Sequence, residues 1–250
     1  MIVAAILLSF VLALNHGAEP LFVNSIASND LDFIRTDDPS SFESASFLGR
    51  KRKEMPDKRS DELFDPKAYA FKVTFKDKVT TEIWAHQSFE IEEESKELIS
   101  LVGNGLGKLP VMMRSKLSHV VLHKRDEVVF GEEEGHFFVL YSENIRKRVK
   151  THDLKETIFH ESIHATLEKD HAKSQKWLED KKKDGDFITK YAMLLPLKED
   201  LPVSALFAYT VLKHPSRLPE EVEKAVHKIM PHRIAYFREL FAKEVAPMPK

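Results

Sequence analysis

The N-terminal half of the chain contains short segments in which apolar and polar residues alternate, as in half-buried strands. AYAFKVTF (68–75) and VTTEIWAH (79–86) show this alternation, and the turn-forming KDK separates them. A helical pattern follows over Glu90–Val102, and the glycines and proline of GNGLGKLP are expected to end it. HVVLH (119–123) and HFFVLY (136–141) are apolar runs of strand length. We therefore predict four strands and one helix in this half.

From about His152 the spacing of apolar residues becomes helical and stays so toward the C-terminus. One helix is predicted over His152–Lys169, and Ala172–Lys182 continues or restarts it. DGDF then breaks the chain, and two further helices are predicted over 203–213 and 219–243. Strands followed by helices predict an α+β fold, with a small twisted sheet in the N-terminal half and a helical C-terminal half.

Composition divides the chain into three parts. The apolar run MIVAAILLSFVLAL is too short to span a bilayer, so we interpret residues 1–18 as a signal peptide, with an uncleaved anchor as the alternative. Polar and charged residues dominate 19–62, where we expect a poorly ordered leader. The basic GRKRKE (49–54) is either a processing site that releases a propeptide or a solvated charge run. The folded domain is expected over 63–250, in a secreted, extracellular protein that has no membrane contact after signal cleavage.

Net charge and cysteine content limit the partners and the metal ligands that can be expected. The formal charge is −2, and the basic clusters are short and lie among acidic residues, so nucleic acid is not an expected partner. The chain has no cysteine, which excludes disulfides, thiolate ligands and cysteine nucleophiles. Any metal site must therefore use histidine, aspartate, glutamate and water.

The stretch HESIHATLEKDH (160–171) contains the spacing of a helical metal site. Residues four apart on an α-helix differ by about 40° and rise about 6 Å, so His160 and His164 project from one face. Two imidazoles placed in this way can occupy adjacent corners of a tetrahedral zinc ion. Glu161 lies about 100° around the helix from His160, beside the metal, where its carboxylate can act as a general base on a zinc-bound water.

The surroundings of the two histidines indicate a buried helix. A buried histidine or glutamate without a partner is costly, and a bound metal satisfies all three polar side chains at once. A core cluster whose members satisfy one another is the alternative. On the helical wheel, apolar residues lie on both sides of the histidines: Phe159, Ile163, Leu167, Leu154, Ile158 and Ala165.

A catalytic zinc site usually has three protein ligands, and several residues compete for the third position. Asp170 has the spacing used when a glycine turns the chain out of the helix, but Leu167 occupies the glycine position. His171 reaches the metal only if the helix breaks locally. Glu199, 35 residues after His164, would supply a carboxylate from a separate element. Spacing alone leaves two other carboxylates open: Glu179 and Asp200.

Several ordered segments resemble a family of predicted secreted zinc peptidases. They are FHESIHATLEKDH, WLEDKKKDGDFITKYAMLLPLKEDL and HRIAYF, within a resemblance that runs from about Ala68 to Phe237 and includes LGKLPVMMRSKL. More distantly, the chain is similar to lethal-factor-type toxin peptidases. The resemblance implies a gluzincin-like zincin fold in which the sheet packs on the active-site helix. It also implies zinc ligands and catalytic groups as follows: zinc on His160, His164 and Glu199, with Glu161 as the base and Tyr191 as a hydroxyl beside the developing oxyanion.

The chain departs from the family pattern at Val203, where relatives carry a second acidic residue. We expect the missing carboxylate to have supported a histidine ligand or the helix start, and Asp200 is the candidate replacement. Zincins usually bind substrate along an edge strand, and HFFVLY (136–141) is the candidate. The adjacent acidic triplet in GEEEG either favours basic substrates or is a solvated loop. Arg233 is a candidate partner for a carboxylate of the site.

The sequence therefore predicts a secreted zinc metallopeptidase that acts on peptide or protein substrates through a water activated by Glu161. The alternative is a non-catalytic secreted zinc-binding protein, a degenerate peptidase that binds a partner. The departure at Val203 supports the alternative.

Overall fold

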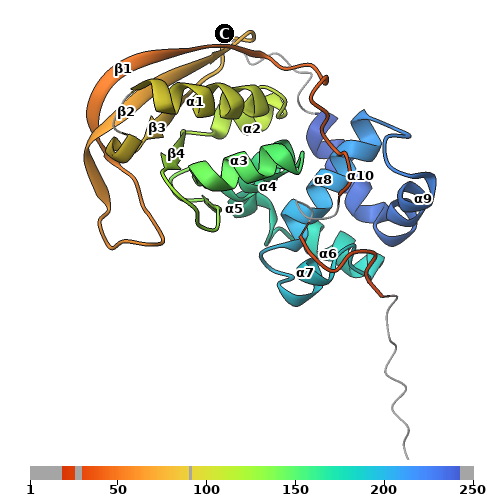
Figure 1. Ribbon diagram of the computed structural model, residues 1–250. Helices are drawn as coiled ribbons and strands as arrows, with labels where there is room; N and C mark the ends of the chain where they lie inside the picture. The colour runs from red at the N-terminus through yellow and green to blue at the C-terminus, as the bar shows by residue number, and fades with distance from the viewer. Residues whose placement is uncertain (1–18, 26–29, 90–91, 243–250) are drawn as a thin grey trace, which may run out of the picture.

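Residues 19–25, 30–89 and 92–242 are described by the structure, a computed structural model, and they form an α+β fold (Figure 1). The predicted fold class is confirmed at this level. A six-stranded mixed sheet occupies the N-terminal half, in the order β1-β2-β3-β4-β6-β5. Its strands are β1 (Phe42–Glu54), β2 (Phe64–Phe75), β3 (Thr80–Ala85), β4 (His119–His123), β5 (Phe130–Glu132) and β6 (Phe137–Tyr141).

The direction of strand pairing changes across the sheet. β1, β2 and β3 pair antiparallel, β3, β4 and β6 pair parallel, and β5 returns antiparallel along β6. β4 and β6 are buried along their whole length, as their apolar runs require. HFFVLY is therefore an interior strand, and the prediction that it forms the edge is wrong. The edge strand on this side of the sheet is β5, which is too short to be recognised by alternation.

Ten α-helices lie within the described residues, mostly after the sheet. α4 is the central one, because it contacts α1, α8, β5 and β6. The helices are α1 (Glu92–Leu106), α2 (Val111–Lys116), α3 (Ser142–Lys150), α4 (Leu154–Thr166), α5 (Glu168–His171), α6 (Gln175–Asp184), α7 (Lys190–Leu194), α8 (Asp200–Lys213), α9 (Glu220–Ile229) and α10 (Pro231–Ala242).

The expected poorly ordered leader differs most from the structure. Residues 42–54 form β1, whose backbone pairs with β2 through bulges while most of its side chains are exposed. Because the hydrogen bonds of the ladder hold this strand, its polar composition does not oppose it. Before β1, Phe33 and Ile34 are buried, and the Phe33 ring meets Phe207 of α8 edge-on at 4.9 Å. Residues 30–54 thus belong to the folded domain.

Two helix boundaries also differ from the sequence prediction. α1 continues through Gly103 and Gly105 to Leu106. A Cβ on Gly105 would lie 2.5 Å from the side chain of Ile158 on α4. The glycine therefore permits close helix packing and does not end the helix. The helix predicted over 219–243 is two helices, α9 and α10, since Pro231 has no N–H to continue the first one.

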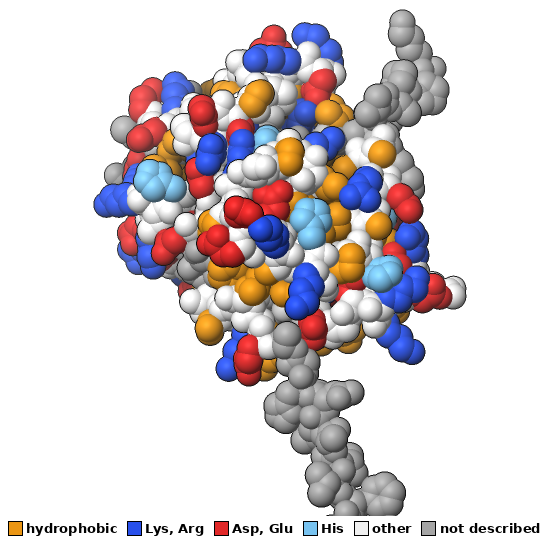
Figure 2. All heavy atoms as spheres, turned by 90° about the vertical axis from the view of Figure 1, so that its right-hand side faces the viewer, with side chains coloured by type: hydrophobic (Ala, Val, Ile, Leu, Met, Phe, Trp, Pro, Cys, Tyr) orange, Lys and Arg blue, Asp and Glu red, His pale blue; other side chains and the backbone are white. Residues whose placement is uncertain are grey.

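The surface of the helical half carries both signs of charge. Acidic and basic side chains are intermixed over the face in Figure 2, with apolar side chains between them. Within the described residues, every helix is too short or too polar to cross a bilayer. The predicted signal peptide, residues 1–18, lies outside the described residues.

Candidate metal centre

The two motif histidines project from the buried central helix α4, one turn apart. The side chain of His160 is 12% exposed and that of His164 is 6% exposed. α8 packs against α4, and Glu199 immediately precedes α8, with a side chain that is only 5% exposed. The packing of these two helices brings Glu199 to the two histidines, although it lies 35 residues after His164 in the sequence.

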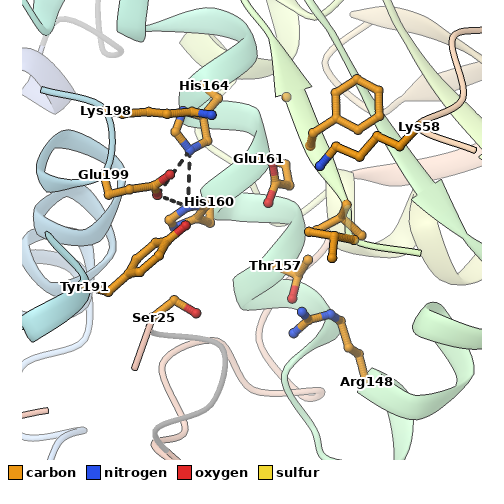
Figure 3. Close-up of a pocket in the computed structure, with 14 residues that line it drawn as sticks. Ser25, Lys58, Arg148, Thr157, His160, Glu161, His164, Tyr191, Lys198 and Glu199 are labelled. Atoms are coloured by element: carbon orange, nitrogen blue, oxygen red, sulfur yellow. Dashed lines mark hydrogen bonds and ion pairs between the residues drawn. The ribbon is translucent and has the colours of Figure 1, made fainter. Parts of the chain in front are cut away.

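The donor atoms of His160, His164 and Glu199 converge on one point (Figure 3). The two histidine Nε2 atoms are 3.2 Å apart, and Glu199 Oε2 lies 3.2 Å from Nε2 of His160 and 3.6 Å from Nε2 of His164. Ligand atoms about 2.0–2.1 Å from a tetrahedral ion are about 3.3 Å apart. The three atoms therefore already have the separations that one small cation requires.

The electrostatics of the cluster favour a cation between these groups. Burial alone would raise the pKa of Glu199, but hydrogen bonds and charge from His160 and His164 hold it well below its usual range. Burial alone would lower the pKa of His164, yet hydrogen bonds to Glu168 and Glu199 raise it to about 10. The carboxylates thus stabilise positive charge at the place where the donor atoms meet.

Glu161 lies beside the donor group and outside it. Its side chain is buried and lines the same pocket as the three donors, as the sequence geometry predicts. In Figure 3 Glu161 lies on the opposite side of the two histidines from Glu199. It is therefore available to a molecule bound in front of the donor atoms.

Tyr191 also lines this pocket, from the start of α7, which Thr189 caps through a hydrogen bond to Ala192 N–H. Its hydroxyl points toward the donor group in Figure 3. Burial, together with the charges of Glu199 and Glu161, raises the pKa of the Tyr191 phenol to about 12. The phenol therefore keeps its proton at neutral pH and can donate a hydrogen bond.

The alternative third ligands lie elsewhere. Nδ1 of His171 is within 2.5 Å of the Tyr236 hydroxyl, so this histidine is tied to α10. Asp170 is exposed and pairs with Lys116 at 2.7 Å. Glu179 pairs with Gln175 on the exposed face of α6. The structure thus brings Glu199, and none of these three residues, to the two histidines.

Glu168 forms a hydrogen bond with His164, and this contact was not predicted from the sequence. Glu168 Oε2 lies 2.6 Å from Nδ1 of His164, the nitrogen that faces away from the donor cluster. A carboxylate in this position fixes the orientation of the imidazole and makes it a better ligand. The four-residue spacing between His164 and Glu168 is the sequence signal that indicates this contact. The sequence predicts one helix over His152–Lys169, whereas Glu168 begins the separate helix α5.

Asp200 was the candidate to replace the carboxylate that is missing at Val203, but its position does not match that role. Among the described residues, Asp200 forms no hydrogen bond or ion pair with a histidine. It accepts a hydrogen bond from Arg233 Nη1 at 2.7 Å and pairs with Lys181 at 3.3 Å, while Arg233 Nε donates to Asp184. Val203 itself is part of the apolar core. Arg233 thus holds the carboxylate next to Glu199 in the chain and anchors the first turn of α8.

No protein-family model matches the chain, and no curated protein or solved structure is significantly similar to it. We therefore interpret the site from its own geometry.

Proposed function

We propose that the chain is a zinc-dependent metallopeptidase of zincin-like fold, with zinc held by His160, His164 and Glu199. The observation that supports this most is the convergence of the three donor atoms at 3.2–3.6 Å with a separate buried carboxylate beside them. Two imidazoles and one carboxylate are a common ligand set for catalytic zinc, and the chain lacks the thiolates of most structural sites. Zinc held there would act as a Lewis acid on a carbonyl oxygen and would lower the pKa of water.

The residues around the donor group would supply proton transfer, oxyanion stabilisation and orientation of a ligand. Glu161 would accept a proton from the attacking water and return it to the amine that leaves. The Tyr191 hydroxyl would donate a hydrogen bond to the carbonyl oxygen as negative charge develops on it. Glu168 would keep His164 in the correct orientation throughout.

The edge strand β5 is the proposed site of substrate pairing. Val129, Phe130 and Gly131 line the pocket together with Tyr191 and Glu199. β5 pairs with β6 on one side only, so its other edge can pair with an extended peptide. A peptide bound there would place its backbone beside Glu161.

The alternative, a non-catalytic zinc-binding protein, is supported less by the structure than by the sequence alone. It rested on the missing acid at Val203, but Glu168 supports His164 and Arg233 anchors α8 without it. Secretion remains the expectation from the apolar run at residues 1–18.

The test is cleavage of a broad peptide library by wild-type protein and by Glu161→Gln, both loaded with equal zinc. Glutamine keeps the shape of glutamate but cannot accept the proton, so we expect cleavage to fall by about 10²–10⁴-fold. Zinc content should be the same in both proteins, because Glu161 lies outside the donor group. If the zinc-loaded wild type leaves the library intact, the chain is a binding protein and the proposal is wrong.

A further inference from the structure

The walls of the pocket carry three basic side chains that the proposed chemistry does not use. Lys58 comes from the loop between β1 and β2, Arg148 from α3, and Lys198 from the link between α7 and α8. Figure 3 shows Lys58 and Arg148 on one side of Glu161 and Lys198 on the other side, beside His164. Positive charge therefore flanks the donor group on both sides.

Lys58 is held beside the edge strand. Its backbone N–H donates to the Tyr141 hydroxyl at 3.3 Å, and its ammonium group lies 4.8 Å from the centre of the Phe130 ring on β5. No carboxylate among the described residues pairs with this ammonium group. It is exposed, so a substrate on β5 would meet an unneutralised positive charge.

Lys198 directly precedes the proposed ligand Glu199 and is also exposed. Within the described part of the chain it likewise forms no ion pair. Arg148 differs from the lysines, because it bonds Asn144 at 2.7 Å and lies 3.4 Å from Asp153. Arg148 is thus partly neutralised, and the two lysines carry the free charge of the pocket.

The negative groups of the pocket do not cancel this charge. Glu199 and Glu168 face the histidines, and a bound dication would offset the charge of Glu199 and Glu161. The acidic triplet Glu132–Glu134, considered above as a feature that favours basic substrates, begins at the end of β5 and does not line the pocket. The part of the pocket beside the donor group would therefore be positive once a dication is bound, whereas the far end of β5 is acidic.

We propose that the pocket selects peptides with acidic side chains on either side of the scissile bond, recognised by Lys58 and Lys198. This inference rests on the proposed peptidase function and names its substrate class. Opposite charges at partly desolvated positions add modest affinity, and they penalise a substrate with like charge more clearly.

Three decapeptide libraries test the proposal, each with the same four randomised central residues and three flanking residues on either side that are all Glu, all Gln or all Lys. Glu and Gln are nearly the same shape, so a difference between those two libraries reports charge. We expect the zinc-loaded wild type to cleave the Glu library with kcat/KM at least tenfold above the Gln library, and the Lys library least. The preference should weaken as salt is raised.

Single variants then assign the preference to residues. Lys58→Gln and Lys198→Gln should each reduce the Glu/Gln ratio about threefold, and the double variant about tenfold. Arginine at either position should keep the ratio. Lys228→Gln, which removes an exposed charge from α9 outside the pocket, should leave it unchanged. Equal cleavage of the Glu and Gln libraries, or an unchanged ratio in the double variant, overturns the substrate class and leaves the peptidase proposal standing.

A binding measurement separates the two proposals if none of the libraries is cleaved. Fluorescence anisotropy would compare a labelled Glu-flanked decapeptide with its Gln-flanked counterpart on zinc-loaded protein. Tighter binding of the Glu peptide, lost in the Lys58→Gln Lys198→Gln double variant, supports acidic selection although peptidase function has failed. Equal affinity for the two peptides overturns it.

Discussion

Alanine in place of Gly131 would test the close approach of β5 to α4. A Cβ at this position would lie 2.6 Å from the backbone oxygen of Glu161 and 2.6 Å from Cβ of His164. Ordinary contacts begin at 3.4 Å, so β5 must move away from α4 by about 0.8 Å. The helix backbone cannot yield, because α4 is packed on several sides.

We expect Gly131→Ala to lower the free energy of unfolding by about 1–3 kcal/mol, the usual cost of overpacking a tight contact. Peptide cleavage should fall much further, by up to about 10²-fold, since a displacement of about 1 Å misplaces the substrate relative to Glu161. Zinc affinity should change little, because none of the three donors lies on β5.

Urea denaturation, kcat/KM on one cleaved peptide and zinc titration would measure these effects. Gly135→Ala is the matched control in the same hairpin, where the new Cβ meets only side-chain atoms, those of the Phe137 ring, and no helix backbone. The control should lose less stability and keep its cleavage rate. A Gly131→Ala protein with wild-type stability and kcat/KM would refute the proposed role of β5.

Three further predictions concern stability and the hydroxyl donor. Phe33→Ala should lower the free energy of unfolding, measured in urea, by about 3–5 kcal/mol, because the Phe33 ring is fully buried. Phe47 is half-exposed, so Phe47→Ala should lower it far less. Equal small effects of the two variants would mean that residues 30–41 contribute little to stability. Tyr191→Phe should reduce kcat about 10²–10³-fold at unchanged zinc content, and an unaltered kcat would remove the hydroxyl from the chemistry. Burial raises the pKa of Glu156 to about 7 from 4.5, so the folded state holds its proton more tightly than the unfolded state. The free energy of unfolding of wild type relative to Glu156→Gln should therefore be greatest below pH 4.5 and fall by about 3 kcal/mol as pH rises through 7. Urea denaturation of both proteins at pH 4.5, 6 and 8 would measure this fall. A difference in stability that does not change with pH would contradict the prediction.

The placement of His160 and His164 side by side was predictable, because a four-residue spacing places two side chains on one helix face without any tertiary information. Glu199 was not predictable from spacing, since its approach depends on how α8 packs against α4. Asp200 illustrates the problem: it is adjacent in the sequence, yet its side chain faces Arg233 in the core. Only the resemblance to zinc peptidases favoured Glu199 before the structure did.

The features that were missed depend on long-range pairing. β1 has a polar composition, and the ladder with β2 that holds it is invisible in its own pattern. Lys58 lies in the loop after β1, in a segment expected to be poorly ordered, so its place in the pocket could not be anticipated. β5 has three residues, too few for a periodic signal, although it forms the edge of the sheet.

The central claim is that His160, His164 and Glu199 hold one metal ion. Zinc bound per chain, measured after dialysis at micromolar zinc, tests it most directly. We predict one zinc in the wild type and in His171→Ala, and almost none in Glu199→Ala. Zinc retained in Glu199→Ala but lost in His171→Ala would contradict the account and move the third ligand to the short motif.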